Sequence, residues 1–187
     1  MILKTSAPVI IDSAEKMIKR AKTRDPEKIC EAYHIRIREM DLSRRIKAYY
    51  YYQSRIHNIV IDTGIVGVFR RILLAHELGH YALHREIAMM RGFHELEVLE
   101  KRDTDPMETE ADLFAAELLL PDEEVLECLR EKTFFETAKI LNVPFALLDF
   151  KYSLLQKKNY AIASMGLKKA GFLKEDLGAY GTPGHWS

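Results

Sequence analysis

Two histidines and a glutamate stand close together near the middle of the chain, where residues 76–80 read H-E-L-G-H. The surrounding residues 72–84 are mostly apolar and contain no proline, so we predict one continuous helix there. Because a helix advances 3.6 residues per turn, His76 and His80 project from the same face, one turn apart. Two imidazoles in this arrangement can bind one Zn²⁺ ion. Glu77 lies beside them and could take a proton from a water molecule on that ion.

A motif this short also arises by chance, and its histidines are then ordinary solvated or core residues. A third metal ligand would decide between the two interpretations. The extended motif that ends in a third histidine is absent, because Glu86 stands where that histidine should be. His84 lies one further turn along the helix from His80, but one straight helix cannot wrap three residues around a single ion. We therefore expect His84 to pack or to support a ligand.

A second candidate segment is residues 108–121, which are rich in Ala, Leu and Glu and end in a proline, as a helix does. Glu108 and Asp112 are four residues apart and share a face. Glu108 would reach the metal, and Asp112 could accept a hydrogen bond from the free ring nitrogen of a ligand histidine. Glu110 is the rival ligand, although it points to a different face from Asp112. The alternative interpretation is that these acids are solvated helix charges.

Small residues indicate that the two helices could pack closely. Gly79 has no side chain, so another element could approach the first helix there. Ala111 and Ala115 lie on or near the face of the second helix that carries Glu108. Close packing at these positions would bring the glutamate to the histidines.

Taken together, the two segments resemble the ImmA/IrrE family of zinc metallopeptidases. The resemblance rests on H-E-L-G-H-Y-A-L-H at residues 76–84, followed by E-x-x-A-D-x-F-A at 108–115 and L-L-L-P at 118–121. Residues 23–29 also resemble the N-terminal helix entry of that family. Two separated motifs that match in order make the resemblance specific, and it covers roughly residues 15–155.

The resemblance implies a site and an activity. His76, His80 and Glu108 would bind one zinc ion per chain, and Glu77 would be the catalytic base. The chain would be a zinc-dependent endopeptidase that cuts a protein, with a transcriptional repressor of a phage or mobile element as the implied substrate. A second interpretation is a metal-stabilised, non-catalytic anti-repressor that only binds a protein partner. Glu77 argues against that second interpretation, because a purely structural metal site needs no base.

Composition excludes several other classes. The chain has 187 residues, of which 48% are hydrophobic, so we expect one globular domain. Its 28 basic and 28 acidic residues balance, so no net charge draws it onto nucleic acid or an anionic membrane. No apolar run approaches the roughly 20 residues of a membrane helix, and the N-terminus is too weak for a signal peptide. Cys30 and Cys128 suit a reducing compartment. We expect a cytoplasmic protein without direct nucleic-acid or membrane partners.

The predicted fold class is α+β, mainly helical, with a small antiparallel three-stranded sheet packed on the H-E-x-x-H helix. Alternating or β-branched patterns indicate the strands, and capping signals indicate two helices before them. The expected order is helices near 12–22 and 26–33, strands near 35–38, 46–52 and 57–62, and the metal helix from 66 or 67 to about 90.

Four consecutive tyrosines, at residues 49–52, stand out in the second strand. On a strand, two rings face each side. One pair could pack on the core while the other half-covers the sheet. A sharper hypothesis is that one strand is an open edge beside the active-site cleft, to which a peptide substrate adds as a further strand.

The C-terminal third contains a pattern typical of a helix-turn-helix. We expect a helix capped by Asp122, and residues 133–145 then resemble the two-helix motif. A DNA-reading second helix needs polar side chains, whereas this one begins with mostly apolar residues, so we interpret it as a packing or partner-binding part. We predict a metallopeptidase domain over residues 1–158, including this helical part at 122–158. Residues 159–187 form a tail without an assignment.

Overall fold

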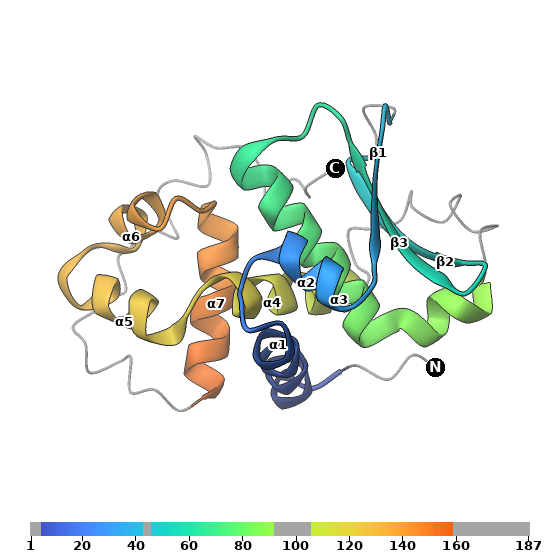
Figure 1. Cartoon of the computed structure of the whole chain (residues 1–187). Helices are drawn as coiled ribbons and strands as arrows, with labels where there is room; N and C mark the ends of the chain where they lie inside the picture. Colours follow the sequence, from blue (N-terminus) through green and yellow to red (C-terminus); the bar gives the residue numbers. More distant parts are fainter. Residues whose placement is uncertain (1–4, 43–45, 92–105, 159–187) are drawn as a thin grey trace.

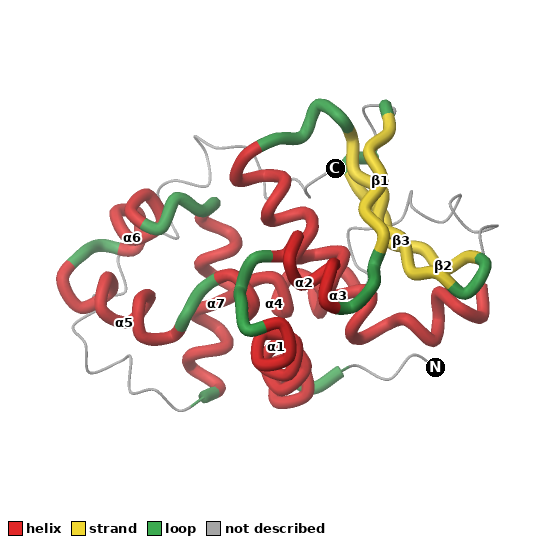
Figure 2. Tube along the Cα trace, viewed as in Figure 1, coloured by secondary structure: helices red, strands yellow, loops and turns green. Residues whose placement is uncertain are grey.

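The computed structural model describes residues 5–42, 46–91 and 106–158. Within this part of the chain there are seven helices and one three-stranded sheet, so the predicted α+β class is confirmed. The sheet lies on one side of α3, and the helices α5 to α7 lie on the opposite side, beyond α4 (Figures 1 and 2). The elements are α1 (Ala7–Ala21), α2 (Pro26–Ala32), β1 (Arg36–Met40), β2 (Ala48–Gln53), β3 (Ile56–Asp62), α3 (Gly67–Arg91), α4 (Pro106–Leu119), α5 (Asp122–Glu131), α6 (Phe134–Ile140) and α7 (Phe145–Lys157).

The first helix begins earlier than its capping signals predict. Ser6 is the N-cap of α1, and Pro8 follows within the first turn, where a proline costs no hydrogen bond. Asp12 therefore lies inside the helix and pairs with Lys16 at 2.6 Å instead of capping it. The second helix is as predicted, because Asp25 caps α2 by accepting a hydrogen bond from the backbone N–H of Glu27.

The sheet is mixed, so the prediction of an all-antiparallel sheet was wrong for one strand. Its order is β1-β3-β2, with β2 antiparallel and β1 parallel to β3. The central strand contains Ile59, Val60 and Ile61, all buried, and such a continuous apolar run favours a strand covered on both faces. The charged strand β1 stays at the edge. β1 and β3 run in the same direction, and their last residues, Met40 and Asp62, are partners in the register.

A two-residue turn joins β2 to β3. Ser54 and Arg55 both have positive φ, 52° and 64°, as a type I′ hairpin turn requires. This turn fixes the register and sends alternate tyrosines to opposite faces. Tyr50 lies 6.0 Å from the ring of Tyr81 in α3, and it packs against the core. Tyr49 and Tyr51 pair with each other at 5.7 Å, so the expected division of the tyrosines into two pairs is confirmed.

Helices α3 and α4 pack closely at one glycine. A Cβ atom at Gly79 would lie 2.9 Å from the Cα of Ala111, which is closer than side-chain carbons approach backbone atoms. The backbones therefore meet where the sequence predicts a close approach. Leu74, Leu78 and Phe114 are fully buried around this contact.

The C-terminal helices have the helix-turn-helix outline that the sequence predicts. Thr133 and Glu136 form a reciprocal capping box at the start of α6. Asn142 takes a left-handed conformation, with φ of 50°, in the turn before α7. Asp122 is not the cap of α5; Pro121 holds that position, and the Asp122 carboxylate turns toward α7.

A buried ionic cluster joins this C-terminal part to α4. We use that name for Glu117, Asp122, Lys151 and Lys158. Lys151 is fully buried and donates to Glu117 at 2.7 Å and to Asp122. Lys158 also binds both carboxylates, at 2.7 Å. Because every charge has a partner, the cluster compensates the cost of removing these groups from water.

No helix among the described residues is both long and apolar enough to cross a membrane. Cys30 is buried and Cys128 is partly exposed, and both are free thiols.

Candidate metal centre

Three side chains from two helices converge at one point of the structure. His76 and His80 come from successive turns of α3, and Glu108 comes from the first turn of α4. The Nε2 atoms of the histidines are 3.1 Å apart, and the Glu108 oxygens lie 3.2 Å from that of His76 and 3.5 Å from that of His80. Glu110, the rival ligand, is not part of this group.

The spacing of these three ligand atoms suits a zinc ion. Zinc binds nitrogen and oxygen at about 2.0–2.1 Å in a tetrahedron, so its ligand atoms stand about 3.3 Å from one another. The two Nε2 atoms are 3.1 Å apart, Oε2 of Glu108 lies 3.2 Å from that of His76, and Oε1 of Glu108 lies 3.5 Å from that of His80; these separations bracket that value. Two imidazoles and one carboxylate are also a common donor set of catalytic zinc, which leaves a fourth position for water. The residues present therefore fit the metal.

Asp112 holds the first histidine. Its Oδ1 atom lies 2.8 Å from Nδ1 of His76. A carboxylate accepts hydrogen bonds, so Nδ1 carries a proton and donates it, and Nε2 is the ring nitrogen left to bind a metal. The structure thus places Asp112 where the sequence predicts a supporting carboxylate.

The electrostatics of the group favour a bound cation. Burial lowers the pKa of His76, but hydrogen bonds with Asp112 and Glu108 and the nearby charges of Asp112 and Glu77 outweigh burial and raise it to about 10. The same carboxylates would attract a divalent metal in place of that proton.

Glu77 follows His76 in α3 and is buried, with 5% of its surface exposed. Helix geometry turns its side chain about 100° from that of His76, toward the same side as Tyr81 four residues later. Tyr81 packs against His57 of β3, at 4.8 Å between ring centres, and against Tyr50 of β2. Glu77 therefore projects from α3 on the side that faces the sheet.

The site has a second hydrogen-bonded branch, in which His84 supports a ligand histidine, as expected, through a carboxylate partner that the sequence did not indicate. His84 approaches His80 with 3.1 Å between their Nδ1 atoms, and its Nε2 lies 2.9 Å from Glu110. Burial raises the pKa of Glu110, but hydrogen bonds from His84 and Thr5 lower it by more than burial raises it. The pKa of Glu110 is therefore below the usual range. The spacing of His80 and His84 signalled their contact, but nothing local to either residue points to Glu110.

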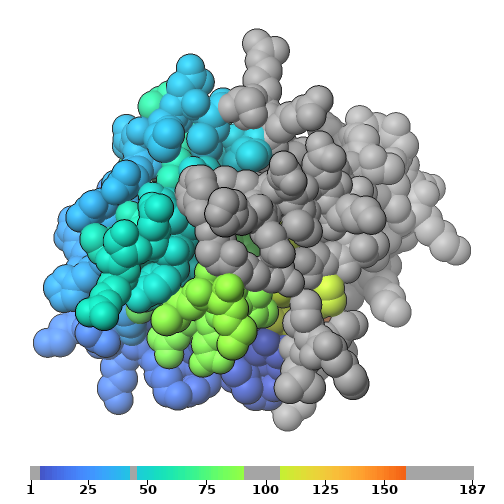
Figure 3. All heavy atoms as spheres, turned by 90° about the vertical axis from the view of Figure 1, so that its right-hand side faces the viewer, coloured from blue at the N-terminus to red at the C-terminus, as the bar shows by residue number. Residues whose placement is uncertain are grey.

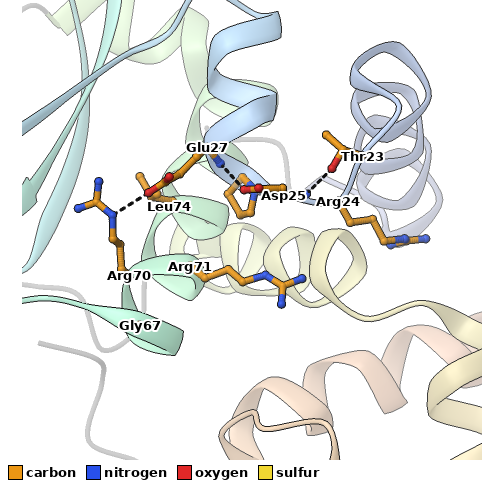
Figure 4. A pocket seen from close by; sticks show the side chains of 9 residues that line it. Thr23, Arg24, Asp25, Glu27, Gly67, Arg70, Arg71 and Leu74 are labelled. Carbon is orange, nitrogen blue, oxygen red and sulfur yellow. Dashed lines mark hydrogen bonds and ion pairs between the residues drawn. The ribbon is translucent and has the colours of Figure 1, made fainter.

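A pocket of about 530 Å³ lies beside the first turns of α3 (Figure 4). Arg70 binds Glu27 at 2.8 Å and Glu39 at 2.9 Å, and so ties α3 to α2 and β1. Arg71 extends away from Glu27 and is exposed. Arg24, on the other side of the pocket, donates to the carbonyls of Glu117 and Leu118 at the end of α4.

An H-E-x-x-H helix that faces a glutamate from a second helix defines a metallopeptidase type of site. Comparison with known proteins agrees, because residues 30–153 match the family described as the IrrE N-terminal-like domain, Peptidase_M78. The chain belongs to this ImmA/IrrE family of metallopeptidases, and the resemblance noted in the sequence is confirmed.

Two relatives extend over most of the chain. An immunity region protein of Bacillus phage phi105 is 30% identical over 163 residues, which cover 86% of this chain and 100% of the relative. Metallopeptidase ImmA of Bacillus subtilis (strain 168) is 29% identical over 142 residues, or 74% of this chain and 81% of the relative. One of the two is thus a phage protein and the other is named as a peptidase.

Proposed function

We propose that this chain is a zinc-dependent endopeptidase that hydrolyses a peptide bond in a protein substrate. The observation that carries the proposal is the convergence of His76, His80 and Glu108, whose nearest nitrogen and oxygen atoms lie 3.1–3.5 Å apart, beside the buried Glu77. A metal-binding triangle alone would serve a structural site equally well. A carboxylate next to it, which is not one of the three ligands, is the addition that hydrolysis requires.

The roles follow from the donor chemistry. His76 and His80 would hold the metal through their Nε2 atoms and Glu108 through its carboxylate. When bound, zinc supplies a Lewis acid that polarises the scissile carbonyl and lowers the pKa of a coordinated water to about 7. Glu77 accepts the proton of the attacking water and delivers it to the leaving amine. Asp112 keeps His76 in the tautomer that presents Nε2.

The shape of the sheet suits an extended substrate. Among the described strands, β2 pairs only with β3, so it forms one edge of the sheet. Strand β2 also contacts α3, and both appear on one face of the molecule, where the residues of the β2–β3 hairpin adjoin the last turns of α3 (Figure 3). A peptide added to this edge would form main-chain hydrogen bonds. Side chains of the tyrosine run would then border its side-chain positions.

The names of the relatives support the substrate class. An immunity region protein and a peptidase named ImmA both match most of this chain, and the former belongs to a phage. We therefore propose a transcriptional repressor of a phage or mobile element as the substrate. The competing function is a non-catalytic anti-repressor that removes the same protein by binding it.

One substitution separates these two functions. Glu77→Gln keeps the volume of the side chain and all three metal ligands but removes the base. For this variant we expect about one zinc per chain by elemental analysis. We expect no cleavage of candidate repressors, with the products identified by mass spectrometry. Glu86→Gln, an exposed position on the same helix, is the matched control and should cleave normally. If Glu77→Gln relieves repression as well as the wild type does, the anti-repressor is the better account.

A further inference from the structure

We infer that His84 and Glu110 are positioning residues that hold His80 in the orientation and tautomer required for metal binding. The inference rests on the proposed zinc site and goes beyond its ligand set. Neither residue touches the metal position, and both lie outside the H-E-x-x-H motif and its downstream glutamate. Together with Thr5 they form a hydrogen-bonded chain, which we call the His84 relay.

The contacts of the relay are continuous. Nδ1 of His80 lies 3.1 Å from Nδ1 of His84, and Nε2 of His84 lies 2.9 Å from Oε2 of Glu110. The backbone N–H of Thr5 donates to Oε1 of Glu110 at 2.7 Å. His84 is 5% exposed and Glu110 is 6% exposed. Polar groups buried to this extent keep their partners, because water cannot replace them.

Donor and acceptor chemistry gives the relay one direction. The Glu110 carboxylate accepts at both oxygens, so Nε2 of His84 must donate. In a neutral imidazole, Nδ1 of His84 then carries no proton. It can accept a hydrogen bond from Nδ1–H of His80. His80 in this tautomer keeps its lone pair on Nε2, the atom that lies 3.1 Å from Nε2 of His76. The relay therefore selects the ring nitrogen that faces the metal position.

The two histidine ligands are supported by the same helix in different ways. Asp112 of α4 binds His76 directly at 2.8 Å. Glu110 projects from another face of α4 and binds His84 at 2.9 Å. His84, one turn beyond His80, spans this gap. A single helix thus supplies the third ligand, Glu108, and the terminal carboxylate of both branches.

The last contact of the relay also links Glu110 to the residue just before α1. Thr5 lies one residue before Ser6, the N-cap of α1. Because its N–H occupies the second oxygen of Glu110, that carboxylate is held in one rotamer with both oxygens used. A carboxylate held at both ends orients His84 more firmly than one free to rotate.

The test measures metal affinity rather than peptide cleavage. Zn²⁺ dissociation constants are determined by competition with a chromophoric chelator for the wild type, His84→Leu and Glu110→Gln. Glu117→Gln is the matched control, since Glu117 is an equally buried carboxylate of α4 whose partners belong to the ionic cluster. We expect His84→Leu and Glu110→Gln to weaken zinc binding about 10- to 100-fold, as loss of a supporting hydrogen bond does. Glu117→Gln should destabilise the fold and leave zinc affinity within about twofold of the wild type.

A second readout separates positioning from packing. ¹⁵N chemical shifts of zinc-loaded protein should show His80 protonated at Nδ1 in the wild type and in Glu117→Gln, with that proton exchanging faster or lost in His84→Leu. Unchanged zinc affinity and an unchanged His80 signal in both relay variants would overturn the inference and leave the proposed function standing. Failure of the wild type itself to bind zinc would overturn both.

Discussion

Replacing Gly79 with alanine should damage this protein, although alanine is the better helix former. The added Cβ would lie 2.9 Å from Cα, 3.1 Å from the carbonyl oxygen and 3.2 Å from Cβ of Ala111. Carbon atoms in contact prefer about 3.5–4.0 Å, so the helices must separate by several tenths of an ångström. The neighbour is backbone and cannot rotate away. Glu108 stands three residues before Ala111, so it would move with α4.

Two opposing terms set the size of the effect. Alanine in place of glycine within a helix stabilises it by about 1 kcal/mol. Overpacking a tight contact costs roughly 1–3 kcal/mol, and a backbone neighbour favours the upper end. The net loss is then about 2 kcal/mol, which for a chain of this size lowers Tm by roughly 4–8 °C. Displacement of Glu108, whose oxygens lie 3.2 Å from Nε2 of His76 and 3.5 Å from Nε2 of His80, should weaken zinc binding as well.

Thermal unfolding and zinc competition measure the two effects together. Gly67→Ala is the control on the same helix, because an added Cβ there meets nothing within 4 Å, although φ is +62°. It should lose about 1–2 kcal/mol from backbone strain and keep its zinc affinity. Ala111→Gly should not rescue Gly79→Ala, since the clash with Cα remains. A Gly79→Ala protein as stable as the wild type, with full zinc affinity, would refute this account of the helix contact.

Three further outcomes follow from the buried charges and the metal site. Lys151→Met should cost about 3 kcal/mol in urea unfolding, because it leaves Glu117 buried with Lys158 alone; a loss below about 1 kcal/mol would contradict the cluster's role. Burial raises the pKa of Asp122, but its hydrogen bonds with Lys151 and Lys158 lower it by more, so its pKa is depressed. This carboxylate therefore stabilises the fold at pH values above the usual aspartate pKa. Tm should therefore fall as the pH drops below about 4, and Asp122→Asn should show a shallower acid slope. Chelation should lower Tm by roughly 5–10 °C relative to protein at a hundredfold excess of free zinc over Kd, a stabilisation of about 2.7 kcal/mol, with no shift in a His76→Ala, His80→Ala variant.

Local patterns in the sequence specified the helix that carries the site. The apolar periodicity, the length of the uninterrupted run and the H-E-x-x-H spacing are all local features of residues 67–91. The predicted helix and the observed one therefore agree closely. The approach at Gly79 was also predictable, because a missing side chain on one helix and Ala111 on another permit a close contact. Glu108 could be proposed because its spacing from Asp112 puts two acids on one face.

Features that depend on distant partners were not predictable in this way. Strand β1 alternates apolar and charged residues, and that pattern does not state which edge it joins or in which direction. The ion pairs of Arg70 are of this kind, because Glu27 and Glu39 come from elements far from it in sequence. Glu110 was considered only as a metal ligand, because nothing near it in sequence indicates His84 as its partner. The start of α1 was misplaced for a local reason, since Asp12 and Glu15 form a capping pattern inside a helix that Ser6 and Pro8 had already begun.

The buried ionic cluster has a consequence for where this chain can be divided. Helices α6 and α7 have the outline of a helix-turn-helix, a unit often transplanted between proteins as a module. Here Lys151 of α7 is fully buried against Glu117 of α4. A fragment that ends after α4 would therefore keep the Glu117 carboxylate without its lysine partners. We therefore expect fragments that end before Lys158 to fold poorly, and fragments of α5 to α7 alone to aggregate. The helix pair is therefore an integral part of the fold, packed through α7 against α4, the helix that carries Glu108.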